Sequence, residues 1–171
     1  MITLYLDMDG VIADFDKAYR AFDPDKSDRK KFRSSVMDGK IFETLELMPN
    51  GRAVLDFVQS FFVEEHKIRV EMLTSMGTFD KEQGAEAKRQ KLVWLEKHGI
   101  TYPANFSRSK EEKALYAHQF AILLDDSIGC IEPFNQKGGH GILHDDSDHK
   151  LSLFNLHRKV FELNQIGATA L

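Results

Sequence analysis

Short apolar segments alternate along the chain with stretches whose apolar residues recur at helical spacing. The apolar segments are nearly continuous and stop at polar or acidic residues, as buried parallel strands do; they cover residues 2–6, 68–73, 120–124 and 141–143. Helices are predicted between them, around the stripe Val54, Leu55, Val58, Phe61 and Phe62, over 81–98, from 109 to about 119, and over 150–165. Strands that alternate with helices predict an α/β fold, a Rossmann-like parallel sheet with helices on both faces.

Two helix boundaries carry their own signals. Ser109 and Glu112 have capping-box spacing, which predicts that a helix begins there. Gly99 follows the polar helix at the position where a left-handed glycine ends many helices.

Residues 14–49 interrupt the alternation. They contain Pro24, a charged run over 23–33 and the aromatic residues Phe15, Tyr19, Phe22, Phe32 and Phe42. We interpret them as a small helical cap inserted after the first strand, above the carboxyl ends of the sheet. The predicted division is therefore a core of residues 1–13 and 50–171 and a cap of residues 14–49. The aromatic residues of the cap are equally compatible with its own core and with a substrate pocket.

Composition removes several classes of protein. The 171 residues include 23 Lys+Arg and 27 Asp+Glu, a net charge of −4. Backbone binding of DNA or RNA usually needs a basic excess, so polymeric nucleic acid is not an expected partner. The single cysteine, Cys130, excludes an intrachain disulfide and a cysteine-based zinc site and favours a cytoplasmic setting. No signal peptide or membrane span is expected.

The strongest candidate chemistry lies directly after the first predicted strand, in Asp7-Met8-Asp9-Gly10. Side chains two residues apart on a strand point to the same side, so Asp7 and Asp9 can face one site. Two close carboxylates repel and require a cation or a shared proton, and Mg²⁺ is the cation that prefers carboxylate oxygens and substrate phosphate. Taken alone, the motif is also compatible with an ordinary turn after a strand.

Three further features have positions that match a phosphate site. Thr74 and Ser75 end the second predicted strand, where hydroxyl and backbone N–H groups can hold a phosphate. Lys113 lies on the predicted helix before the next strand, and Asp125-Asp126 ends that strand. In parallel sheets ligands bind at the carboxyl ends of the strands, so these residues are expected to converge there.

In this order, the motifs Asp7-Met8-Asp9-Gly10-Val11, Met72-Leu73-Thr74, Lys113 and Leu123-Leu124-Asp125-Asp126 resemble those of the haloacid dehalogenase (HAD) superfamily of phosphotransferases. The longer segment from Asp7 to Phe15 is similar to the opening of its 5'(3')-deoxyribonucleotidase branch. The resemblance covers residues 7–126. It departs from that branch in lacking cap tryptophans, since the single Trp94 falls on the helix after Thr74, where a packing role is the better interpretation.

The resemblance implies a role for each matching residue. Asp7 would be the nucleophile that forms an aspartyl-phosphate, and Asp9 the general acid and base. Mg²⁺ would be held by Asp7, the backbone carbonyl of Asp9 and Asp125, with Asp126 orienting a water on the metal.

The substrate would meet a second set of residues. Thr74, Ser75 and Lys113 would bind the phosphoryl group, and Phe15 would line a nucleotide pocket. Lys110, on the same predicted helix, is a rival to Lys113.

The sequence therefore predicts a magnesium-dependent phosphomonoesterase, with a nucleoside 5'-monophosphate as the expected small-molecule substrate. A phosphatase for a sugar phosphate and a non-catalytic binding module of the same fold remain alternatives, and a homodimer is left open. The histidines near the last strand, His140, His144, His149 and His157, match no zinc-ligand spacing, so we expect no metal site there.

Overall fold

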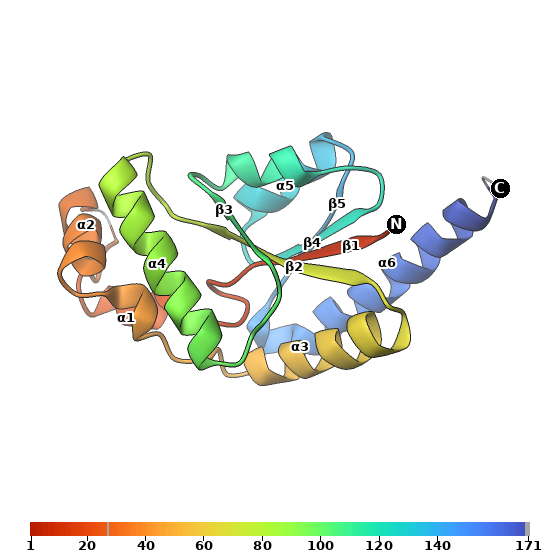
Figure 1. The fold of residues 1–171 in the computed structure, drawn as a ribbon, viewed down its shortest axis with the longest axis horizontal. Helices are drawn as coiled ribbons and strands as arrows, with labels where there is room; N and C mark the ends of the chain where they lie inside the picture. Colours follow the sequence, from red (N-terminus) through yellow and green to blue (C-terminus); the bar gives the residue numbers. More distant parts are fainter. Residues whose placement is uncertain (27, 170–171) are drawn as a thin grey trace.

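Parallel strands form one twisted sheet in the order β3-β2-β1-β4-β5 (Figure 1). The computed structural model describes residues 1–26 and 28–169, and within these the sheet has five strands. Their bounds are Thr3–Leu6 for β1, Arg69–Ser75 for β2, Ala104–Ser107 for β3, Ala121–Asp125 for β4 and His140–Leu143 for β5. The order reverses direction at β1, as in doubly wound Rossmann-like sheets. The predicted α/β class is confirmed.

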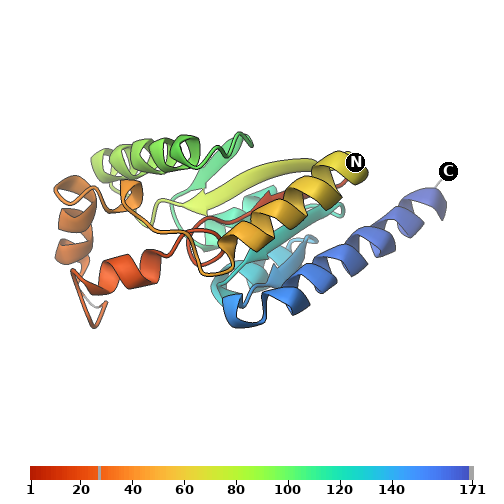
Figure 2. The ribbon, with the colours of Figure 1, turned by 90° about the horizontal axis from the view of Figure 1, so that it is seen from below.

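Helices cover both faces of the sheet. One face carries α3 (Gly51–Phe57), which continues as the π-helical segment η2 (Val58–Glu65), together with α4 (Lys81–Lys97) and α6 (His149–Thr169). The other face carries α5 (Ile128–Gln136) and the 3₁₀ helix η3 (Glu111–Tyr116). In Figures 1 and 2, α3 and α6 run side by side, and α5 lies across the sheet from them.

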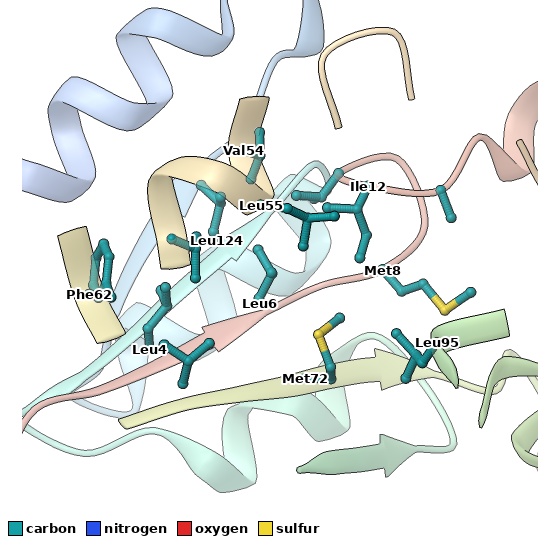
Figure 3. Packing of buried hydrophobic residues seen from close by; sticks show 14 of the residues in the cluster. Leu4, Leu6, Met8, Ile12, Val54, Leu55, Phe62, Met72, Leu95 and Leu124 are labelled. Atoms are coloured by element: carbon teal, nitrogen blue, oxygen red, sulfur yellow. The ribbon is translucent and has the colours of Figure 1, made fainter. Parts of the chain in front are cut away.

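Alternation along the central strand β1 builds the two cores. Leu4 and Leu6 are fully buried and point to the side of α3 and α6, where they meet Leu124 and Phe62 (Figure 3). Tyr5 points to the opposite side, into a smaller cluster around α5. Because both faces of β1 are buried, its sequence is a continuous apolar run rather than an alternating one.

The segment 14–49 forms α1 (Phe15–Arg20), α2 (Arg29–Met37) and the 3₁₀ helix η1 (Ile41–Glu43), which gather at one end of the molecule beside α4 (Figure 1). Trp94 of α4 is fully buried and donates a hydrogen bond from Nε1 to the Leu45 carbonyl at 2.8 Å. Trp94 is thus a packing residue, as its position predicted. Gln90, one turn earlier, donates to the Val36 carbonyl and accepts from the Phe42 N–H. Helix α4 therefore fastens the inserted segment to the core; the division into two domains stays a prediction.

The structure corrects the predicted elements at three points, one of which is helix α5 (Ile128–Gln136), since no predicted element covers it. Strand β3 was not predicted, because this edge strand is only half-buried along Ala104–Phe106 and carries a polar Asn105. The helix expected from 109 to about 119 is the six-residue 3₁₀ helix η3, although the Glu112 N–H does approach the Ser109 hydroxyl at 3.4 Å. The remaining predicted strands and helices are present, and α6 is preceded by a short 3₁₀ helix, η4 (Asp146–Asp148).

No helix among residues 1–26 and 28–169 is long and apolar enough to cross a membrane.

Candidate active site

The loop after β1 places the first two candidate carboxylates. Leu6 pairs with Leu124 in the parallel register of β1 and β4, so Asp7 and Asp125 follow at neighbouring positions at the carboxyl ends of the two strands. The backbone then turns tightly, with the Ala13 N–H donating to the Met8 carbonyl at 2.9 Å and the Gly10 N–H to the Ala13 carbonyl at 2.8 Å. This turn returns the chain toward the core at Ala13.

Gly10 is required in that turn for two reasons. Its φ of +78° lies in the left-handed region that side chains disfavour. A Cβ at this position would also lie 2.1 Å from Asp126 Oδ2. The absence of a side chain therefore lets Asp126 approach the Asp7 loop.

Asp7, Asp125 and Asp126 converge at this point. Each offers a carboxylate oxygen, and the three atoms lie within 4.8 Å of one another. Asp7 and Asp125 are buried, whereas Asp126 is exposed. In the part of the chain that the structure describes, this is the one group of three or more acidic, histidine or cysteine side chains with such spacing, so the histidines near β5 form no comparable cluster.

Lys113 lies between two of these carboxylates. Its buried ammonium donates to Asp125 Oδ2 at 2.6 Å and lies 2.8 Å from Asp7 Oδ1. Burial alone would lower the pKa of Lys113, but the negative charges of Asp7 and Asp125 outweigh it and raise the pKa well above its ordinary value. Lys113 is therefore a permanent cation at the end of the sheet.

One lysine does not neutralise the cluster. Burial and repulsion from Asp125 raise the pKa of Asp7 to about 6, against the opposing effect of Lys113. Loss of hydration inside the pocket, together with the charges of Asp7 and Asp125, raises the pKa of Asp126 to about 7. Burial and mutual repulsion thus disfavour the charged forms of Asp7 and Asp126, and additional positive charge would be stabilised at this place.

The donor set fits a divalent cation. All three side chains offer hard carboxylate oxygens, which Mg²⁺ prefers, and burial together with the neighbouring negative charges raises the pKa values of Asp7 and Asp126. The Asp9 carboxylate is not part of this group.

Asp9 has a different partner, Lys91. The Lys91 ammonium, on α4, donates to Asp9 Oδ2 and, at 2.8 Å, to Thr74 Oγ1. Burial raises the pKa of Asp9, and the charge of Lys91 opposes this effect. Lys91 did not figure among the residues expected at the site. A signal was present, because Lys91 falls between Ala87 and Trp94 on the buried stripe of α4, where an unpaired lysine is costly.

The carboxylates lie at the base of a cavity of about 920 Å³ that opens between the sheet and the segment 14–49. Phe15, Phe32 and Phe42 line one part of it. Phe15 stacks on Tyr19 and on Phe42, with ring centroids 5.3 and 5.4 Å apart. The aromatic residues of the segment thus form a small core of their own, and three of them also face the cavity; Phe22 is exposed elsewhere.

The other expected phosphate ligands lie in different positions. Ser75 lines the cavity, and its hydroxyl accepts a hydrogen bond from the Gly77 N–H at 3.0 Å. Thr74 is fully buried, and its hydroxyl oxygen accepts a hydrogen bond from the Lys91 ammonium. Lys110 also lines the cavity but donates to the Ser127 hydroxyl at 2.9 Å, away from the paired position of Lys113.

No protein-family model and no curated protein sequence matches this chain. Among solved structures, the chain is similar to a hydrolase from Pseudomonas syringae, with 12% identity, a TM-score of 0.49 and coverage of 89% of this chain and 90% of that one. It is also similar to D,D-heptose 1,7-bisphosphate phosphatase from Burkholderia thailandensis, with 13% identity, a TM-score of 0.46 and coverage of 81% and 75%.

Replacing Gly10 with alanine is expected to weaken Mg²⁺ binding by about tenfold or more, equivalent to ~1.4 kcal/mol, because the new Cβ displaces Asp126. Gly138→Ala is the matched control, since Gly138 has a similar φ of +84° but nothing within 4 Å of its Cβ position. Isothermal titration calorimetry with Mg²⁺ measures both variants. Equal affinities for the two would show that Asp126 does not take part in holding the ion.

The stabilisation by Mg²⁺ is expected to increase with pH. An acid whose pKa is raised on folding contributes stability that is present below its unfolded pKa, near 3.8 for Asp7 and Asp126, and that is lost as the pH rises through about 6 to 7. The metal-free protein should therefore lose stability over this range, and Mg²⁺ should restore it. The measurement is the shift in melting temperature on adding Mg²⁺ between about pH 5 and 8. A shift that is constant or falls with pH would contradict the assignment, and the exposed Asp56→Asn variant serves as the control.

Proposed function

We propose that this protein is a magnesium-dependent phosphomonoester hydrolase of the HAD type. The observation that carries the proposal is the arrangement of Asp7, Asp125 and Asp126 around one buried lysine, Lys113, at the base of a cavity. Phosphoryl transfer needs mainly positioning and positive charge, and this group of side chains offers both. The sequence motifs that resemble the HAD superfamily supply the same residues in the same order.

Asp7 is the proposed nucleophile. In the first step its carboxylate oxygen forms a bond to phosphorus while the bond between phosphorus and the leaving oxygen breaks, and the Asp9 carboxyl gives its proton to that oxygen. In the second step Asp9 takes a proton from water, which attacks phosphorus and releases Asp7 and phosphate. The proton count is balanced over the cycle, and the products are an alcohol and inorganic phosphate.

Positive charge would come from two sources. Lys113 is already fixed beside Asp7 and would face the phosphoryl oxygens. Asp7, Asp125 and Asp126 would hold Mg²⁺, together with the Asp9 backbone carbonyl as the resemblance implies. When bound, the ion neutralises negative charge on the phosphoryl group and lets it approach the carboxylates.

We further propose a nucleoside 5'-monophosphate as the substrate. Phe15, Phe32 and Phe42 present aromatic surface to the cavity, which suits stacking of a flat base. The cavity volume, about 920 Å³, is ample for a mononucleotide. A sugar phosphate would use the same carboxylates and lysine but would gain little from the aromatic wall.

Asp7→Asn is expected to abolish hydrolysis of a generic phosphomonoester such as 4-nitrophenyl phosphate, because the amide is a poor nucleophile. The wild-type activity should require Mg²⁺ and disappear with a chelator. The exposed Asp56→Asn variant should retain full activity. Failure of the wild-type protein to hydrolyse any phosphomonoester with Mg²⁺ would favour a non-catalytic binding module instead.

Phe15→Ala is expected to raise the KM for nucleoside 5'-monophosphates by about tenfold, the loss of ~1.4 kcal/mol of stacking, and to leave the KM for a sugar phosphate nearly unchanged. Phe22→Ala, a change in the same segment at a ring that does not line the cavity, is the control. The measurement is steady-state kinetics on a panel of nucleotides and sugar phosphates. If a sugar phosphate is the best substrate and Phe15→Ala leaves the nucleotide KM unchanged, the nucleotide assignment is wrong.

A further inference from the structure

Lys91 is a buried charge that the proposed reaction does not yet use. Its side chain is fully inaccessible to solvent, and it comes from the middle of α4, a helix that otherwise buries apolar and amide side chains. An ammonium group is costly to bury unless its donors are satisfied. The partners that satisfy it therefore indicate what it does.

Its partners are two residues of the candidate active site and one of the inserted segment. Lys91 Nζ donates to Asp9 Oδ2 and to Thr74 Oγ1, and it lies 4.3 Å from the centre of the Phe42 ring. The aromatic face is a favourable neighbour for a cation, and it covers the ammonium from the side of the segment 14–49. Lys91 thus joins the loop after β1, the end of β2 and η1 at a single atom.

The two oxygens of Asp9 are left in different states. Oδ2 is held by Lys91, whereas Oδ1 is buried and has no hydrogen-bond partner among the described residues. Asp9 lines the cavity, while Lys91 and Thr74 do not. One oxygen is therefore held by Lys91, and the other lacks a partner that the described residues could supply.

From this arrangement we propose that Lys91 is the positioning residue of the proposed general acid and base. It fixes the Asp9 carboxyl group through Oδ2, so that Oδ1 is the atom that gives a proton to the leaving oxygen and later takes one from water. Thr74 Oγ1 also accepts a hydrogen bond from Lys91, so the end of β2 helps to hold the ammonium in place. This inference rests on the proposed phosphatase function and identifies a residue that the resemblance does not.

The position of Phe42 adds a link to the segment 14–49. Because the ring covers the ammonium, the segment must be in place for Lys91 to be shielded from water. The inserted segment would then contribute to the acid and base as well as to the pocket.

The test uses the dependence of the rate on the leaving group. An alkyl phosphomonoester has a poor leaving group that needs protonation, whereas 4-nitrophenyl phosphate has a good one that needs little. Lys91→Met removes the charge and keeps most of the volume. It is expected to lower kcat/KM for an alkyl phosphomonoester by about a hundredfold, the usual scale of general acid catalysis, and for 4-nitrophenyl phosphate by less than about tenfold.

Controls separate positioning from a structural or phosphate-binding role. Lys88→Met, the same change at an exposed position one turn away on α4, should leave both kcat/KM values within about twofold of wild type. Lys91→Arg retains the charge. Relative to Lys91→Met, it should restore kcat/KM for the alkyl phosphomonoester more than kcat/KM for 4-nitrophenyl phosphate. In an Asp9→Asn background, Lys91→Met should have little further effect, because the two residues act as one unit. Thermal unfolding confirms that each variant is folded, and Lys91→Gln replaces Lys91→Met if the latter does not fold.

The outcomes distinguish the two levels of the proposal. Two results would overturn the role of Lys91 without affecting the proposed phosphatase function. One is an equal decrease in kcat/KM for the two substrates in Lys91→Met. The other is a decrease in the double variant that equals the product of the decreases in Lys91→Met and Asp9→Asn. A wild-type protein without magnesium-dependent hydrolysis of either substrate would overturn the proposed function, and the role of Lys91 with it.

Discussion

The ammonium group of Lys113 is buried between the carboxylates of Asp7 and Asp125, at 2.8 and 2.6 Å. An ion group of this kind is stable only when its charges are mutually satisfied, and here they are satisfied incompletely, because Asp126 adds another carboxylate to the same place. The folded chain therefore retains an unbalanced negative charge at one end of the sheet. A divalent cation would relieve it, and the phosphate of the proposed substrate would then meet two positive centres instead of three anions.

Three features of the fold create this arrangement: a strand pairing, a tight turn and one helix. Parallel pairing of β1 with β4 brings Asp7 beside Asp125, and the tight turn at Gly10 leaves room for Asp126. Helix α4 adds Lys91 from the side and holds the segment 14–49 through Gln90 and Trp94. The result is a site with two lysines, one for the carboxylates proposed to hold the metal and one for the proposed acid and base.

The pattern of apolar and polar residues was sufficient to predict the elements that are strongly apolar. The runs around β1, β2, β4 and β5 indicated a parallel sheet, and Asp7 and Asp125 were expected at its carboxyl end because they directly follow or end two of these runs. The pattern left Lys113 and Lys110 as rivals. Strand β3 could not be predicted, because an edge strand is less buried and its sequence is less apolar. The role of Lys91 at the site could not be predicted, because its partner, Asp9, lies 82 positions away in the sequence. Only the packing of α4 against the sheet brings the two residues together. The pattern also could not predict that Phe42 packs against Phe15 and lines the cavity as well.

In the proposed reaction, Asp7 carries the phosphoryl group between the two steps. Rapid acid quenching of the wild-type protein during turnover of a phosphomonoester with a radiolabelled phosphoryl group tests it directly, followed by mapping of the labelled peptide. We expect a magnesium-dependent label on the peptide that contains Asp7, released by hydroxylamine as is typical of an acyl phosphate, and no label in Asp7→Asn. Rapid turnover with no label on the protein, or with the label on another residue, would contradict it.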